Sequence, residues 1–179
     1  MNELQAFFEK IEELKHKERE GWRKNGVDRP RDTIASHSFG AALIGWIMAE
    51  EEGLDSDRIV KMLLLHDLIM AYIDDYTPED KEFEDKKEIE MEASERMFKD
   101  VPDSVEDEMR EMFDELQEME SEEAVFVNDC DKLDTLLQAS SYLSDEELDE
   151  FIEFYRDEIS TETGKEVFED IVEEKDSSE

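Results

Sequence analysis

Two of the three histidines stand where their side chains could bind a metal ion. His37 opens a run of helix-forming residues, whereas His66 follows the apolar segment 62–65 and is joined directly to Asp67. A histidine at the end of a buried helix needs partners for both ring nitrogens. A buried carboxylate is costly unless a cation or a donor neutralises it. One divalent metal ion would satisfy both demands, and the alternative is a histidine hydrogen-bonded within the core.

Helices must bring these residues together. Apolar residues recur every three or four positions, which is typical of helices with one buried face, and no strand pattern of useful length occurs. The segment 21–35 lacks a period and predicts a loop. We therefore predict an all-α, single-domain helical bundle, with helices at about 2–18, 37–52, 55–67, 79–100, 104–119, 122–142, 145–159 and 162–171.

The composition restricts the possible partners. The chain has 56 acidic and 20 basic residues and a formal charge of -36, which disfavours binding to DNA or RNA as a polymer. Because 38% of the residues are apolar and follow a helical period, we expect a folded protein with an acidic surface. Repulsion within that surface is relieved in concentrated salt, where the Debye length falls to ~3 Å at 1 M. A salt-rich cytoplasm is the predicted setting.

The chain of 179 residues suits one domain, predicted at 1–172 with a core at about 10–143 and a polar tail at 173–179. A single cysteine, Cys130, excludes an internal disulfide. The N-terminus has no signal-peptide pattern, and the apolar stretches fall short of the ~20 residues that cross a membrane. We expect a cytoplasmic protein without a membrane partner.

Five segments add a resemblance to this picture. In chain order they are Arg19-Glu20-Gly21-Trp22, Asp32-Thr33-Ile34-Ala35-Ser36-His37-Ser38, Leu63-Leu64-Leu65-His66-Asp67, Asp74-Asp75-Tyr76-Thr77-Pro78 and Phe126-Val127-Asn128-Asp129-Cys130-Asp131-Lys132-Leu133-Asp134. Together they resemble the HD-domain phosphohydrolases, specifically the 5'-deoxynucleotidase branch. The resemblance implies an HD-type helical bundle, and relatives of this branch often form homodimers.

The resemblance implies that one divalent metal ion is held by His37, His66, Asp67 and Asp131. Asp131 is selected by the resemblance alone, because an aspartate in so acidic a chain is ordinarily solvated. Imidazole and carboxylate ligands suit Mn, Fe, Co, Ni or Zn, and Mg less well. A water on such an ion becomes a hydroxide nucleophile near neutral pH, and the cation polarises the phosphoryl group.

The resemblance also implies which residues meet the substrate. Arg19 corresponds to an arginine suited to a phosphate, although an exposed helix-end charge is the alternative. Trp22 is predicted either to pack against a sugar or base or to close the loop as a buried residue. Asp75 matches an aspartate on the sugar side of the family's pocket.

Met70 departs from the family pattern. Relatives usually have a catalytic glutamate there, and general acid–base help is typically worth ~10²–10⁴-fold in rate. Asp74 is a candidate for partial compensation, with a role as one more surface carboxylate as the alternative. The predicted catalytic residues are therefore Asp67, Asp75 and Asp74.

These residues predict a metal-dependent phosphomonoesterase that acts on a nucleoside 5'-monophosphate or another small phosphate ester. The main alternative is a metal- and nucleotide-binding protein, a sensor or dimeric scaffold, that has weak or lost catalysis because of Met70. A third possibility is a purely structural helical protein, which would bind no metal. The pattern does not locate a dimer interface.

Overall fold

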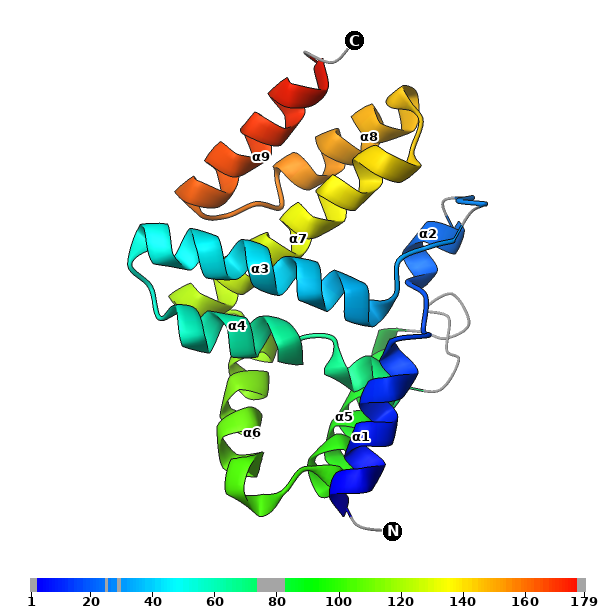
Figure 1. Cartoon of the computed structure of the whole chain (residues 1–179), viewed down its shortest axis with the longest axis vertical. Coiled ribbons are helices and arrows are strands. Elements are labelled where there is room, and N and C mark those ends of the chain that lie inside the picture. The colour runs from blue at the N-terminus through cyan, green and yellow to red at the C-terminus, as the bar shows by residue number, and fades with distance from the viewer. Residues whose placement is uncertain (1–2, 25, 29, 74–82, 177–179) are drawn as a thin grey trace. The chain divides into compact units, whose positions relative to one another are not determined.

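The computed structural model describes residues 3–24, 26–28, 30–73 and 83–176. Its elements, labelled in Figure 1, are α1 (Glu3–Leu14), α2 (Glu20–Lys24), α3 (Ile34–Glu52), α4 (Ser56–Leu65), the 3₁₀ helix η1 (Leu68–Ala71), α5 (Phe83–Asp100), α6 (Asp103–Glu118), α7 (Glu122–Tyr142), α8 (Asp145–Arg156) and α9 (Glu162–Asp176). Within the described ranges, the extended pairing is limited to one bridge between Glu18 and Thr33. The all-α prediction is confirmed. None of the helices described is both long and apolar enough to span a membrane.

The structure differs from the sequence prediction at several helix boundaries. The first helix ends at Leu14, because residues 17–19 pair with 32–34 through bonds such as Ile34 N to Lys17 O at 2.8 Å. The short helix α2 lies inside the segment predicted as a loop, and it buries Trp22. At the other end, α9 continues to Asp176, past the predicted limit of 171.

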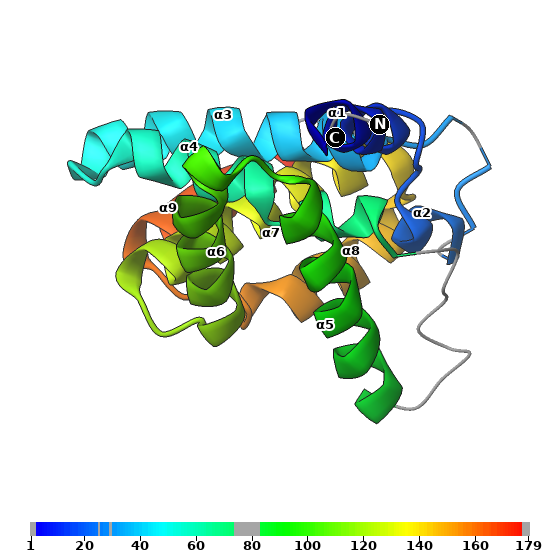
Figure 2. The ribbon, with the colours of Figure 1, turned by 90° about the horizontal axis from the view of Figure 1, so that it is seen from below.

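The chain divides into two compact units, which are described separately. Unit 1 comprises residues up to 36 and 64–117, and unit 2 comprises 37–63 and the residues from 118 onward. In unit 1, helices α1 and α5 and the turn η1 pack against one another. The contact between α5 and α6 is aromatic, with the rings of Phe98 and Phe113 5.7 Å apart and the Arg110 guanidinium 4.1 Å from the Phe98 ring. Figure 2 shows these two helices in green.

Unit 2 is built around α7, which buries more side chains than any other described helix of this unit. Helices α8 and α9 pack on α7, as Figure 1 shows. On α3, Gly45 allows a close approach of α4 and α7, since a Cβ atom there would overlap Leu63, press on Ile59 and contact the sulfur of Cys130. A side chain at this position would therefore separate the helices that carry the candidate site.

The start of α9 is tied to α7 by a buried carboxylate. Asp129, with no exposed surface, accepts hydrogen bonds from the backbone N–H groups of Ser160 and Thr161, at 3.0 and 2.7 Å, and from the Thr161 hydroxyl at 2.7 Å. Helix N-terminal N–H groups lack partners within their own helix, and a carboxylate is a favourable acceptor for them. Asp129 therefore has a structural role, close in sequence to the predicted ligand Asp131.

Candidate metal centre

In unit 2, two carboxylates of α7 contact the imidazole of His37 on α3. His37 is only 1% exposed. Its Nε2 lies 2.8 Å from Oδ1 of Asp131, and its Nδ1 lies 2.7 Å from Oδ2 of Asp134. An ionised carboxylate can only accept a hydrogen bond, so the ring nitrogen that faces it carries the proton unless a cation takes that place. The structure thus places Asp131, a predicted ligand, against His37, and it adds Asp134 on the other ring nitrogen.

Helical spacing explains how this arrangement forms. Asp131 and Asp134 are three residues apart, so both project from the same face of α7. Gly40 follows His37 by the same spacing on α3, and the space that a Cβ atom would need there is filled by Oδ1 of Asp134. The Asp131 carbonyl also accepts a hydrogen bond from the buried Thr135 hydroxyl at 2.9 Å. Close packing of two long helices therefore fixes the positions of His37, Asp131 and Asp134.

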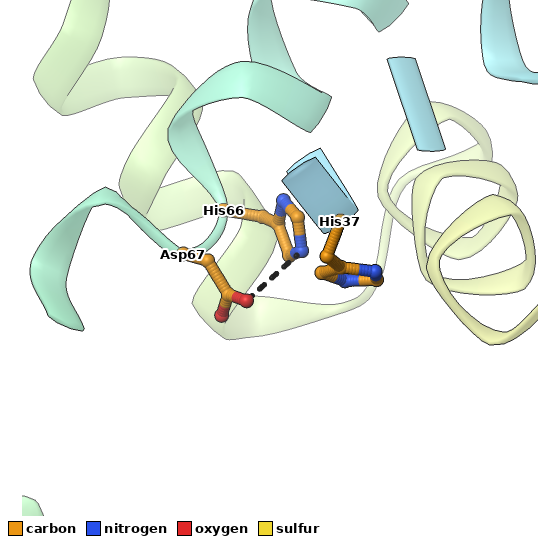
Figure 3. Close-up of side chains that lie close together, drawn as sticks. All are labelled: His37, His66 and Asp67. Carbon is orange, nitrogen blue, oxygen red and sulfur yellow. Dashed lines mark ion pairs between the residues drawn. The ribbon is translucent and has the colours of Figure 1, made fainter. Parts of the chain in front are cut away.

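In unit 1, the predicted ligands His66 and Asp67 are consecutive residues. His66 follows the last residue of α4, and its Nε2 lies 3.6 Å from Oδ2 of Asp67, the pair joined by the dashed line in Figure 3. The chain then turns at once, since the N–H of Met70 donates to the Asp67 carbonyl at 3.0 Å. Buried residues of η1, among them Leu68 and Ile69, anchor this turn. A helix end and a tight turn thus position His66 and Asp67.

Lys17 stabilises the same turn through hydrogen bonds to backbone carbonyls. The Lys17 ammonium donates to the carbonyls of Met70 and Ile73, both at 2.8 Å. The Met70 side chain is half-buried and carries no group able to move a proton. Asp74 and Asp75, the two other predicted catalytic residues, lie outside the described residues.

The predicted phosphate-binding residue, Arg19, lies in unit 1 beside Trp22. Its guanidinium is 5.9 Å from the Trp22 ring, and its Nη1 is 3.8 Å from Oδ2 of Asp32. The Arg19 N–H also donates to the Asp32 carbonyl at 3.1 Å. Trp22 is only 3% exposed, in keeping with the predicted alternative in which it closes the loop. Asp32 was not singled out by the sequence, because one carboxylate among many carries no signal.

The donor set suits a divalent transition-metal ion. It offers imidazole nitrogens and carboxylate oxygens, the ligand types that such ions accept. The 2.8 Å between Nε2 of His37 and Oδ1 of Asp131 is close to the ~3 Å that separates two ligands at right angles with bonds of ~2.1 Å. Burial, helped by the charges of Asp129 and Asp131, raises the pKa of the Cys130 thiol far above its usual range. Cys130 is therefore a neutral core residue in this structure.

Comparisons with known proteins agree with this chemistry. The family model described as HD domain matches residues 11–174. The 5'-deoxynucleotidase HDDC2 of Bos taurus is 30% identical over 140 residues, which span 78% of this chain and 67% of that protein. The enzyme of the same name from Dictyostelium discoideum is 30% identical over 150 residues, 79% of this chain and 78% of that protein.

Solved structures share the fold. A protein of Pyrococcus horikoshii OT3 superposes with a TM-score of 0.73 at 33% identity, covering 95% of this chain and 96% of its own. A protein of Magnetospirillum magnetotacticum MS-1, described as a predicted metal-dependent phosphohydrolase, has a TM-score of 0.69 at 23% identity, covering 97% of this chain and 91% of its own. The second likeness supports the fold alone.

Proposed function

Since the chain belongs to the HD-domain family and is a metal-dependent phosphohydrolase of the 5'-deoxynucleotidase type, we propose that it releases phosphate from nucleoside 5'-monophosphates. The observation that carries the proposal is the buried His37 ring with a carboxylate on each nitrogen, in a chain that also places a His-Asp pair at a helix end. That donor set consists of ligand types that bind divalent transition-metal ions.

We propose that His37, His66, Asp67 and Asp131 hold one divalent ion. His37, His66 and Asp67, which Figure 3 labels, are ligand-type residues that could hold a metal ion. Asp131 is supported by its 2.8 Å approach to the imidazole. Mn, Fe, Co, Ni and Zn fit these ligands better than Mg does. When bound, such a cation supplies Lewis acidity toward the phosphoryl group and lowers the pKa of water.

The substrate contacts are assigned to residues of this chain. Arg19 binds the phosphate, because its guanidinium offers paired donors in a fixed plane. Asp32, 3.8 Å away, and the Trp22 ring restrict the directions in which that guanidinium can point. Trp22 acts through this packing and through the loop it closes, while Asp75 meets the sugar and Asp74 assists proton transfer.

Met70 is the reason to consider a second function, a binding protein with weak turnover. The thioether cannot replace a glutamate as acid or base. However, the relatives with clear similarity are named as enzymes, which favours turnover. Met70 is therefore expected to lower the rate rather than to abolish it.

The proposal is tested with the full chain purified in molar KCl. Metal content is measured by elemental analysis, and phosphate release is measured on matched deoxyribonucleoside and ribonucleoside monophosphates with each candidate metal. We expect one ion per chain and turnover that depends on it. Chelation should abolish phosphate release, and Mn²⁺ or Co²⁺ should restore it. A chain that binds no metal, or that binds metal and cleaves none of the esters, would contradict the proposal.

We further propose that the protein is a homodimer that associates through one face of α3. Residues 34–49 include no Asp, Glu, Lys or Arg, in a chain of which 42% is charged. Helical spacing places exposed apolar side chains on one arc of about 100°. These are Phe39, Leu43, Trp46 and Ile47, of which Phe39 and Ile47 are more than 60% exposed.

Charge supports a second copy as the occupant of this face. Two chains of formal charge -36 repel each other over most of their surfaces, and this face is free of that repulsion. Sedimentation should give the mass of a dimer for the native chain and of a monomer for Trp46→Glu. Phe154→Glu, which alters an exposed aromatic residue of α8, is the matched control and should remain dimeric. A monomeric native chain would rule out the proposed assembly.

The same charge supports a salt-rich cytoplasm as the setting. The free energy of unfolding is expected to rise between 0.1 and about 2 M KCl, because salt screens the like charges. Denaturant titrations at several KCl concentrations measure this dependence, and a flat dependence would contradict it.

A further inference from the structure

We propose that Asp134 is a positioning residue that orients His37 for metal binding, an inference that rests on the proposed function. The starting observation is the 2.7 Å hydrogen bond from Nδ1 of His37 to Oδ2 of Asp134. Imidazole has two nitrogens, and either can carry the proton in the neutral ring. A carboxylate acceptor on Nδ1 keeps the proton there and leaves Nε2, which faces Asp131, to donate its lone pair to a cation.

Asp131 and Asp134 differ in exposure and in surroundings, and this difference indicates different roles. The Asp131 side chain is 31% exposed, whereas that of Asp134 is 17% exposed. Oδ1 of Asp134 fills the space beside Gly40 where a side chain would otherwise lie. One oxygen of Asp134 is therefore committed to the imidazole, and the other lies against the backbone of α3. This leaves Asp131 as the carboxylate able to reach an ion.

The arrangement also resists rotation of the ring. His37 is buried, and bonds at opposite edges of the imidazole fix its plane between α3 and α7. Loss of the Nδ1 partner would allow the ring to turn and to exchange tautomers. Outer-sphere partners of metal-binding histidines typically contribute ~10–100-fold to metal affinity. Asp134 is expected to contribute in this range.

The test is a titration of the metal-free full chain with Co²⁺ in molar KCl, followed by visible absorbance. Asp134→Ala should raise the dissociation constant about 10- to 100-fold. Asp134→Asn keeps an acceptor of the same size without the charge and should lose less, about threefold. Glu122→Ala, which removes an exposed carboxylate from the same helix, should bind like the native chain. Thermal unfolding of each metal-free variant shows how much of the effect is structural.

Several outcomes would overturn the inference. A dissociation constant of Asp134→Ala within about twofold of the native value would refute the positioning role while the metal site stands. Equal losses of Co²⁺ affinity in the Ala and Asn variants would mean that the charge of Asp134, and not its hydrogen bond to His37, supports metal binding. If Asp134→Ala does not fold, unchanged affinity in Asp134→Asn refutes it instead. A native chain that binds no Co²⁺, Mn²⁺ or Zn²⁺ would refute the proposed function itself.

Discussion

The predicted metal ligands of unit 2 and those of unit 1 are held in position in different ways. In unit 2, residues 94 or more positions apart in sequence meet because α3 and α7 pack closely, and hydrogen-bond distances of 2.7 and 2.8 Å fix one ring. In unit 1, His66 and Asp67 are neighbours at a helix end, and Nε2 of His66 lies 3.6 Å from Oδ2 of Asp67. Helix packing positions the predicted ligands of unit 2, and a turn positions those of unit 1.

This difference predicts different costs of mutation. A ligand held by packing is part of the core, so its loss affects both metal binding and folding. A ligand at a turn is supported mainly by the backbone, so its loss affects metal binding alone. Met70, where the resemblance implies a glutamate in the family, lies close in sequence to the unit 1 residues, and substitutions at Met70 are expected to change the catalytic rate without loss of the fold.

The largest expected effect comes from removing either of the two histidines predicted as ligands. His37→Ala and His66→Ala should each weaken Co²⁺ binding by more than ~100-fold, beyond the loss expected for an outer-sphere partner. His37→Ala should also lower the free energy of unfolding by ~1–3 kcal/mol, because it removes a buried group from two carboxylates. His66→Ala should lower it by less. Metal titration and urea unfolding of the metal-free variants measure both quantities, and equal losses of stability would contradict the contrast.

The second prediction concerns catalysis at Met70, close in sequence to His66 and Asp67. Met70→Glu should raise the turnover number about 10-fold or more, since a positioned acid or base is typically worth ~10²–10⁴-fold. The Lys17 ammonium, which binds the Met70 carbonyl at 2.8 Å, lies close enough to influence the new carboxylate. Initial rates on nucleoside monophosphates measure the change, with Met70→Gln as the uncharged control. No increase in the Glu variant would mean that the missing glutamate does not limit the rate.

The third prediction tests the packing of α3 against α7 in unit 2 without removing a polar group. Gly40→Ala places a methyl group where Oδ1 of Asp134 lies, so the free energy of unfolding should fall by ~1–3 kcal/mol. Co²⁺ affinity should fall with it. Gly21→Ala on α2 is the control, because a Cβ atom there meets nothing within 4 Å and should be neutral or stabilising. Similar urea midpoints for the two variants would show that α3 and α7 are less closely packed.

The smallest effect on the metal centre is expected at Asp129. Asp129→Asn should cost ~1–3 kcal/mol of stability, because it disrupts the bonds to Ser160 and Thr161. Co²⁺ affinity should stay within about threefold of the native value, since Asp129 and the His37 ring have no partner in common among the bonds described here. Thermal unfolding and metal titration check the two parts. A large loss of affinity would link the start of α9 to the metal centre.

The sequence by itself determined the helical class, most of the helix ranges and the two conspicuous histidines. Apolar periodicity is a local property, so it can be read without knowing the packing. The capping box at Ser144 and Glu147 is equally local, because its bonds connect residues three apart. The short helix α2 and the turn η1 escaped prediction because segments of four or five residues are too short to show a period.

Only the tertiary structure decided which carboxylate faces which nitrogen of His37. Asp131 and Asp134 share a helix face, and the glycine after His37 is visible in the sequence, yet in a chain with 56 acidic residues these features are not distinctive. The roles become different when α3 and α7 come together, because one ring has two nitrogens and each meets one carboxylate. Spacing along a helix determines the face on which a side chain lies, whereas packing between helices determines which residue that side chain contacts.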